Sequence, residues 1–155
     1  MRVHIGSDHA GFEAKQHLVS QLTERGHDVV DHGPHAYDAL DDYPPFCLAT
    51  GSAVVADPGS LGVVLGGSGN GEQIAANKVD GVRAALVWSR DVARLAREHN
   101  DANVISVGAR MHSADDVLAF VTEFLKTPFS GDDRHRRRIA QLAEFERSHE
   151  VPPLS

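Results

Sequence analysis

The sequence predicts an α/β fold in which a parallel sheet of five strands is covered by helices on both faces. Five short apolar segments occur along the 155 residues, and segments long enough for a helix separate them. This alternation is typical of βαβ units. The central segment, residues 61–65, is apolar throughout, as expected for a strand buried on both faces. No internal repeat interrupts the pattern, so we expect one domain over residues 1–150 and a tail at 151–155.

The first half of the chain is predicted to form three strands and two helices. The strands are expected at residues 2–6, 28–31 and 61–65. Residues 11–25 are expected to form the first helix, because apolar residues recur there near the helical period and Gly26 follows as a C-terminal stop. The second helix, at residues 46–55, follows Pro44 and Pro45, and proline suits a first helical turn.

The second half is predicted to form two strands and four helices. The strands are expected at residues 82–88 and 104–107, and the helices at 71–78, 91–99, 114–125 and 132–149. Asp132 and Asp133 stand where the last helix needs an N-cap. Because the strands end before this helix begins, we expect it to pack across the domain or onto a second subunit.

Composition narrows the classes of function. The net charge of −7 argues against general nucleic-acid binding, which needs a basic surface. No apolar run approaches the roughly 18 residues of a membrane span, and none resembles a signal peptide. Cys47 is the only cysteine, so an intrachain disulfide is impossible and a reducing cytoplasm is the expected location. Its apolar neighbours indicate that Cys47 fills the core rather than acting as a nucleophile.

The most informative segment is residues 61–78, which read as a strand, a glycine-rich loop and a helix. Such a turn presents main-chain N–H groups and a helix N-terminus, and both attract negative charge. Gly66 and Gly71 have the spacing of a P-loop, but Glu72 and Gln73 stand where a P-loop needs lysine and serine or threonine. A carboxylate there would repel a polyphosphate. The loop is therefore predicted to bind a small, transient anion beside a base, which suggests carbanion chemistry.

Ligands of doubly wound sheets bind outside the carboxyl ends of the strands. We expect this rule to gather the polar residues that follow the strands into one crevice: Asp8, His9, the loop 67–72, His99, Asn100, Arg110 and His112. Each also has an ordinary structural explanation. Asp8 suits a helix cap, whereas Glu72 and His99 suit the helix dipole. Their shared placement at strand ends favours a functional site.

The basic run near the C-terminus contains a second candidate site. Arg134 and Arg138 are four residues apart on one predicted helix, so their side chains point the same way. Two guanidinium groups at that spacing suit a phosphate group. Arg136 and Arg137 are expected to lie on a solvated helix face.

Two other sites are poorly supported. In the segment GSDHAG at residues 6–11, Asp8 replaces the second glycine that a dinucleotide-binding loop needs for the approach of the pyrophosphate. His32 and His35 lie close to Asp31, but no second group of metal ligands accompanies them. We therefore expect neither a dinucleotide nor a metal site.

The sequence resembles the type B ribose-5-phosphate isomerases, a family that includes galactose-6-phosphate and allose-6-phosphate isomerases. The resemblance rests on GSDHAG at 6–11, DYP at 42–44, GGSGNG at 66–71 and REHN at 97–100, together with Arg134 and Arg138. It covers essentially the whole chain. It implies a Rossmann-like αβα sandwich that interconverts ribose 5-phosphate and ribulose 5-phosphate in the non-oxidative pentose phosphate pathway. It also implies a homodimer or dimer of dimers, with interfacial active sites that use no metal or cofactor.

The resemblance further implies roles for individual residues. The phosphate would be held by His9, Arg110, Arg134 and Arg138. Asp8 and His99 would open the sugar ring and contact its hydroxyls, and Tyr43 would line the sugar pocket. The anion hole would consist of the main-chain N–H groups of residues 67–71, with Gly67, Gly69, Asn70 and Gly71 among them. The neighbouring subunit would supply His99, Asn100, Arg110, Arg134 and Arg138.

One position departs from a common family pattern, in which the loop carries a cysteine base. This chain has Ser68 there, and a neutral serine is a poor base near pH 7. The chain resembles the subgroup in which Glu72 removes the proton from C2 to give a cis-enediolate, with Ser68 as a hydrogen-bonding neighbour. Two alternatives remain: an isomerase of six-carbon phosphosugars, and a module that binds a phosphosugar without turning it over.

Overall fold

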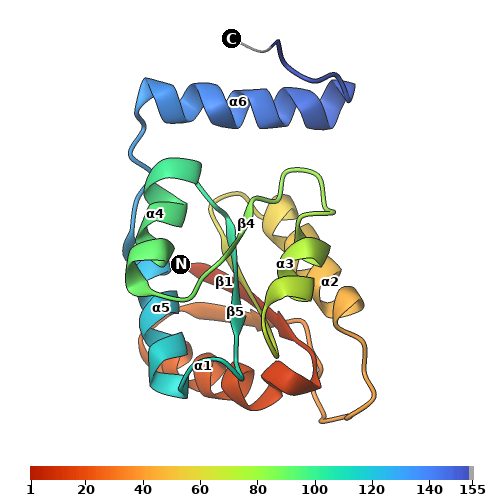
Figure 1. The fold of residues 1–155 in the computed structure, drawn as a ribbon. Coiled ribbons are helices and arrows are strands. Elements are labelled where there is room, and N and C mark those ends of the chain that lie inside the picture. Colours follow the sequence, from red (N-terminus) through yellow and green to blue (C-terminus); the bar gives the residue numbers. More distant parts are fainter. Residues whose placement is uncertain (154–155) are drawn as a thin grey trace.

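A parallel sheet forms the centre of the protein in this computed structural model, which describes residues 1–153 (Figure 1). The strands are β1 Arg2–Ser7, β2 Asp28–Asp31, β3 Leu61–Gly66, β4 Ala84–Leu86 and β5 Val104–Gly108. They lie in the order β2-β1-β3-β5-β4, and every neighbouring pair is parallel. β3 is buried along its whole length, as its apolar sequence predicts. The predicted five-stranded α/β fold is confirmed.

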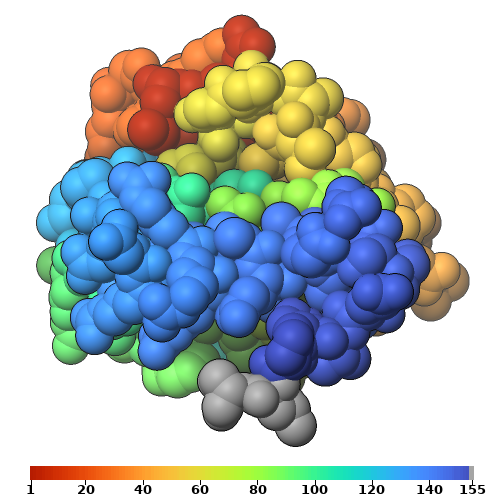
Figure 2. Space-filling view, turned by 90° about the horizontal axis from the view of Figure 1, so that it is seen from above, coloured from red at the N-terminus to blue at the C-terminus, as the bar shows by residue number. Residues whose placement is uncertain are grey.

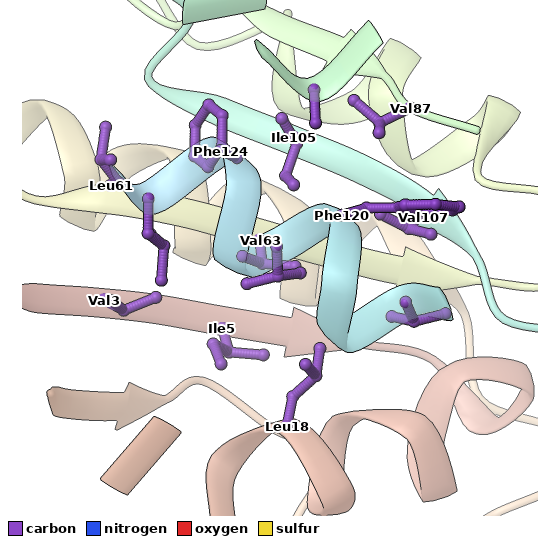
Figure 3. Close-up of a cluster of buried hydrophobic side chains, with 14 of the residues drawn as sticks. Val3, Ile5, Leu18, Leu61, Val63, Val87, Ile105, Val107, Phe120 and Phe124 are labelled. Atoms are coloured by element: carbon purple, nitrogen blue, oxygen red, sulfur yellow. The ribbon is translucent and has the colours of Figure 1, made fainter. Parts of the chain in front are cut away.

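Helices cover both faces of the sheet (Figure 1). The helices on one face are α1 Phe12–Glu24, α4 Arg90–Asn100 and α5 Ala114–Lys126, and those on the other are α2 Tyr43–Ala56 and α3 Asn70–Ala76. A short 3-10 turn, η1 His9–Gly11, joins β1 to α1. The larger core cluster fills the first interface, where Phe120 and Phe124 of α5 pack with Val63 and Ile105 of the sheet (Figure 3).

A smaller core cluster lies between the sheet and the helices α2 and α3. Cys47 belongs to it and is fully buried, as predicted for core filler. Burial raises the pKa of the Cys47 thiol, and the nearby charges of Glu72 and Asp8 raise it further. A thiol in this environment stays protonated and is a poor nucleophile.

The last helix, α6 Asp133–Ser148, lies across the amino-terminal edge of the sheet (Figures 1 and 2). It packs against α4, and the N–H group of Gly81, just before β4, donates to Glu146 of α6 at 3.2 Å. His135 is its only buried residue, whereas Leu142 and Phe145 are 57% and 42% exposed. This helix therefore crosses the domain, and it leaves part of its apolar face uncovered.

The observed ranges of α2 and β4 differ from the predicted ones. α2 begins at Tyr43, so that both prolines lie within its first turn. β4 spans only three residues, because it is an edge strand whose free side is occupied by side chains. The amide of Asn77 both accepts from the N–H group of Ala84 at 2.8 Å and donates to its carbonyl at 2.9 Å. Asp132 is the N-cap residue of α6, but its side chain makes no capping hydrogen bond.

The predicted tail has no helix or strand at residues 151–153, and residues 154–155 lie outside the described part of the chain. Among the helices that the structure describes, none combines the length and the apolar character needed to cross a membrane.

Candidate active site

The glycine-rich loop joins β3 to α3 at the carboxyl edge of the sheet, as predicted. Gly69 has a φ of 84°, and a Cβ there would lie 2.8 Å from Leu86 and 3.1 Å from the main chain of Gly108, so only glycine fits. The hydroxyl of Ser106 donates to the carbonyl of Gly69 at 2.7 Å. The loop is thus fixed against β5, and its main-chain N–H groups come directly before the first turn of α3.

Glu72 lies in that first turn and is only 4% exposed. Its carboxylate folds back onto the α-carbon of Gly66 at the end of β3, where a Cβ would overlap it. Burial raises the pKa of Glu72 above its usual value, and the charge of Asp8 adds to the increase, whereas the main-chain N–H groups of Glu72 and Gly69 oppose it. A carboxylate with a raised pKa is a stronger base than an ordinary glutamate.

Asp8 follows β1 directly and is buried. Its Oδ1 accepts hydrogen bonds from the N–H groups of Ala10 and Gly11 at 2.9 and 3.2 Å, so the predicted capping role is confirmed. Its Oδ2 lies 4.0 Å from Nδ1 of His9. One oxygen of Asp8 therefore caps the 3-10 turn while the other lies beside a candidate substrate-binding residue.

His9 is held by a residue that the sequence analysis did not single out. Its Nδ1 lies 2.8 Å from Oδ1 of Asp41, and its main-chain N–H group donates to the same oxygen at 2.9 Å. The hydrogen bond with Asp41 raises the pKa of His9, which favours the imidazolium form.

His9 and Arg110 line one cavity of about 460 Å³. The exposed Arg110 side chain passes beside Gly67, where a Cβ would lie 3.6 Å from its Cδ and Nη1 atoms. The Arg110 main-chain N–H group donates to the carbonyl of Gly67 at 3.1 Å. An imidazolium and a guanidinium at the same cavity suit a phosphate dianion.

Tyr43 and Ser68 complete the group of predicted residues at this edge. The ring of Tyr43, at the start of α2, covers Gly71, where a Cβ would lie 2.7 Å from the ring carbon Cζ. Ser68 is exposed, and its hydroxyl oxygen accepts from the main-chain N–H group and the side-chain amide of Asn70, both at 3.3 Å. Within one chain, this edge therefore gathers the following predicted residues: Asp8, His9, Tyr43, Gly67, Ser68, Gly69, Asn70, Gly71, Glu72, Arg110 and His112.

The remaining four predicted residues lie at the opposite edge of the sheet. His99 and Asn100 end α4, and Arg134 and Arg138 are exposed residues of α6. The prediction that His99 and Asn100 join the crevice at the carboxyl edge of their own chain is therefore wrong. α4 starts after the carboxyl end of β4 and returns to the amino end of β5, so its last turn lies at the amino edge (Figure 1).

The position of Arg110 differs from the one that the resemblance implies for it. The resemblance assigns it to the neighbouring chain, together with the four residues of the far edge. In the structure, Arg110 lies beside Gly67 and His9 of its own chain. The cause is local: Arg110 comes two residues after the end of β5, whose carboxyl end lies beside that of β3.

The far-edge residues form their own organised group where α4 meets α6. The rings of His99 and His135 pack with their centroids 4.4 Å apart, and Oγ of Ser130 lies 2.8 Å from Nδ1 of His135. Burial lowers the pKa of His135, and the charges of His99 and of the flanking arginines lower it further. The ring of His135, whose lowered pKa favours the neutral form, thus joins the helix that carries both arginines to the helix that carries His99.

The sequence did not indicate the roles of three residues that shape these groups: Gly66, Asp41 and His135. Gly66 was noted only for its spacing, and the overlap with Glu72 depends on a side-chain conformation that spacing does not reveal. Asp41 is one of several aspartates in a polar loop, and His135 stands within a basic run. No pattern in the sequence distinguishes these residues from their neighbours.

Asp8, His9 and Asp41 are also the one group of three potential metal ligands found among residues 1–153, with their donor atoms within 4.8 Å of one another. Hydrogen bonds explain this arrangement. Oδ1 of Asp8 and Oδ1 of Asp41 both accept main-chain N–H groups, and Nδ1 of His9 is paired with Asp41.

The fold and this edge of the sheet define a class: a Rossmann-like αβα protein in which a buried carboxylate, Glu72, lies beside a glycine-rich loop and a cavity lined by His9 and Arg110. Comparisons with known proteins name the family. The ribose/galactose isomerase family model matches residues 3–142. The ribose-5-phosphate isomerase B of Mycolicibacterium paratuberculosis is 58% identical over 154 residues, covering 99% of this chain and 97% of the relative. The ribose-5-phosphate isomerase B of Escherichia coli is 33% identical, and the match covers 94% of this chain and 96% of the relative.

Solved structures agree with these relatives. The ribose-5-phosphate isomerase B of Clostridium thermocellum matches with a TM-score of 0.92 and 40% identity, over 97% of this chain and 100% of that one. The enzyme of Mycoplasma genitalium, solved with bound ribulose-5-phosphate, matches with a TM-score of 0.91 and 38% identity, over 95% and 97%. The chain belongs to the ribose/galactose isomerase family.

Proposed function

We propose that this protein is a ribose-5-phosphate isomerase that interconverts ribose 5-phosphate and ribulose 5-phosphate through a cis-enediolate. One observation carries the proposal: a buried carboxylate, Glu72, lies beside the main-chain N–H groups of a glycine-rich loop. Aldose–ketose isomerisation needs a base for the proton on C2 and donors for the charge that then develops on oxygen. The names of the relatives, at up to 58% identity over nearly the whole chain, support the same reaction.

Glu72 is the proposed base. It takes the proton from C2 of the open-chain aldose and returns it to C1 to give the ketose. The main-chain N–H groups of residues 67–71 stabilise the enediolate oxygen, and one donor of this kind is typically worth about 3–4 kcal/mol. Ser68, as a hydrogen-bonding neighbour, orders the loop through Asn70.

The phosphate is proposed to bind His9 and Arg110 of one chain together with Arg134 and Arg138 of another. Binding energy from this remote group orients the sugar over Glu72. Asp8 and His99 exchange the proton that opens the furanose ring. Tyr43 lines the sugar pocket, and Asn100 contacts the substrate from the second chain.

These roles need a homodimer, because one chain holds the two groups of residues at opposite edges of its sheet. In a two-fold pairing the far edge of each copy meets the carboxyl edge of the other, and two equivalent composite sites form. A groove of about 630 Å³ between α6 and β4 supports a partner at this face, since exposed Trp88, Leu142 and Phe145 line it. Pairing of two such dimers would give the tetramer.

We further propose that the reaction takes place in the cytoplasm and needs no metal or cofactor. A single, buried cysteine suits a reducing compartment. Glu72 and the loop amides supply both proton transfer and charge stabilisation. Dialysis against EDTA should therefore leave turnover unchanged, and a loss that added metal restores would contradict this point.

The test is turnover in D2O with purified protein, followed by NMR. Ribose 5-phosphate should give ribulose 5-phosphate with deuterium at C1, because Glu72 exchanges its proton with solvent. Complete absence of deuterium would indicate hydride transfer instead. Faster turnover of allose 6-phosphate would indicate a six-carbon isomerase, and binding of ribose 5-phosphate without any ketose would indicate a non-catalytic module.

A further inference from the structure

The contact between His9 and Asp41 is more constrained than a surface ion pair. Oδ1 of Asp41 accepts a hydrogen bond from the main-chain N–H group of His9 at 2.9 Å. The same oxygen lies 2.8 Å from Nδ1 of the His9 ring. The Asp41 side chain is only 10% exposed, and its Oδ2 is buried without a hydrogen-bond partner. A carboxylate placed in this way holds both the backbone and the ring of the same histidine.

The contact also determines which ring nitrogen is free. Nδ1 is paired with Asp41, and His9 lines the cavity that it shares with Arg110. Nε2 is therefore the nitrogen that remains to donate to a ligand there. A histidine that donates from both nitrogens carries a positive charge, which is the form that attracts a phosphate dianion.

We propose that Asp41 is a positioning residue, which orients the His9 ring and keeps it doubly protonated so that Nε2 donates to the substrate phosphate. This inference rests on the proposed function, in which His9 binds that phosphate. Asp41 itself does not contact the substrate, because its buried carboxylate acts through His9.

The other charged and titratable groups around His9 include both negatively and positively charged side chains. Asp8 adds a second negative charge at 4.0 Å, whereas Arg110 opposes protonation. Tyr37 packs edge-on against the ring at a centroid distance of 6.4 Å, and Glu13 and His112 line the same cavity. Of all these contributions, the hydrogen bond that His9 donates to Asp41 raises the pKa of His9 most, and burial is the largest opposing one.

The consequence is a pH dependence of substrate binding. KM should stay low while His9 is charged and rise once the pH passes its raised pKa. With Asp41→Asn, an amide replaces the carboxylate, so the pKa of His9 falls and the same rise occurs at lower pH. Between the two midpoints, KM of the variant should be roughly 3- to 10-fold above that of the wild type, while kcat changes little.

The experiment measures KM and kcat from pH 5.5 to 9 for the wild type and Asp41→Asn, in the full-length protein. Asp38→Asn is the matched control, because Asp38 is an exposed aspartate of the same loop whose side chain accepts only from the N–H group of Leu40. Histidine side-chain NMR without substrate gives the pKa of His9 directly, with His9→Gln identifying its signal. This second readout does not depend on activity and also reports whether the variant is folded.

The expected result is a lower pKa of His9 and an earlier rise of KM in Asp41→Asn, with the Asp38→Asn curve superimposed on that of the wild type. In a His9→Gln background, Asp41→Asn should add nothing. If His9→Gln raises KM but Asp41→Asn changes neither curve, the role of Asp41 is wrong while the phosphate site survives. If His9→Gln leaves KM unchanged, the proposed phosphate site itself fails.

Discussion

The carboxylate of Glu72 lies against the α-carbon of Gly66, in space that any side chain at position 66 would fill. This contact explains how a glutamate in the first turn of a short helix comes to be buried rather than solvated. The glycine-rich loop thus contributes main-chain donors and also accommodates the base.

Replacing Gly66 by alanine tests that contact. The added methyl group should displace the Glu72 carboxylate and lower kcat roughly 100-fold, because a shift of about 1 Å in a catalytic group has costs of this size. Gly67→Ala is the control for folding, since its Cβ meets only ordinary contacts, with Arg110 atoms at 3.6 Å. Near-normal kcat in Gly66→Ala, with melting temperatures alike in both variants, would contradict the assigned position of Glu72.

Glu72→Gln should abolish turnover but stabilise the folded protein. Burial raises the pKa of Glu72 in the folded state, so the folded protein binds the proton of this carboxyl group more tightly than the unfolded chain does. The wild type therefore loses stability as the pH rises from the ordinary glutamate pKa through the raised value, whereas the glutamine variant does not. Melting temperatures should be similar near pH 4 and higher for the variant at pH 8.

The control for that comparison is Glu150→Gln, because Glu150 is an exposed glutamate beyond the end of α6. It should change neither turnover nor the pH dependence of melting. A Glu72→Gln protein that melts below the wild type at pH 8, or that still turns over ribose 5-phosphate at a near-normal rate, would be inconsistent with a buried base.

Arg138→Ala should raise KM for ribose 5-phosphate by roughly 10-fold or more, because hydrogen bonds to charged groups contribute about 1.5–3 kcal/mol. We expect a smaller change in kcat. Arg137→Ala removes the same charge from the neighbouring exposed position of α6 and should leave KM near the wild-type value. Equal effects of the two substitutions would indicate general electrostatic attraction rather than a phosphate contact.

The sequence predicted the sheet well, because each buried strand is a short apolar run between polar or glycine-rich segments. It predicted β4 as too long, since Val82 and Val87 are buried and apolar but lie outside the bounds of the strand. The stretch before β4 instead turns, with the N–H group of Val82 donating to the carbonyl of Val79 at 3.0 Å. Burial alone did not reveal where an edge strand begins.

The candidate site was predicted only in part. Residues directly after β1, β3 and β5 meet at one edge, as the rule for parallel sheets requires. His99 and Asn100 do not, because they end the helix that returns from β4 to β5. The contact of Asp41 with His9 depends on how the loop before α2 folds back over β1, and no local pattern encodes that path.

The proposed enzyme depends above all on Glu72 of one chain and His99 of another sharing a site. Glu72→Gln and His99→Asn proteins, each nearly inactive alone, are mixed in equal amounts under conditions that allow subunits to exchange. Random pairing places one intact site in half of the dimers, so the account predicts recovery of about a quarter of wild-type activity. A mixture no more active than its two parents, with exchange verified by mass spectrometry, would contradict it.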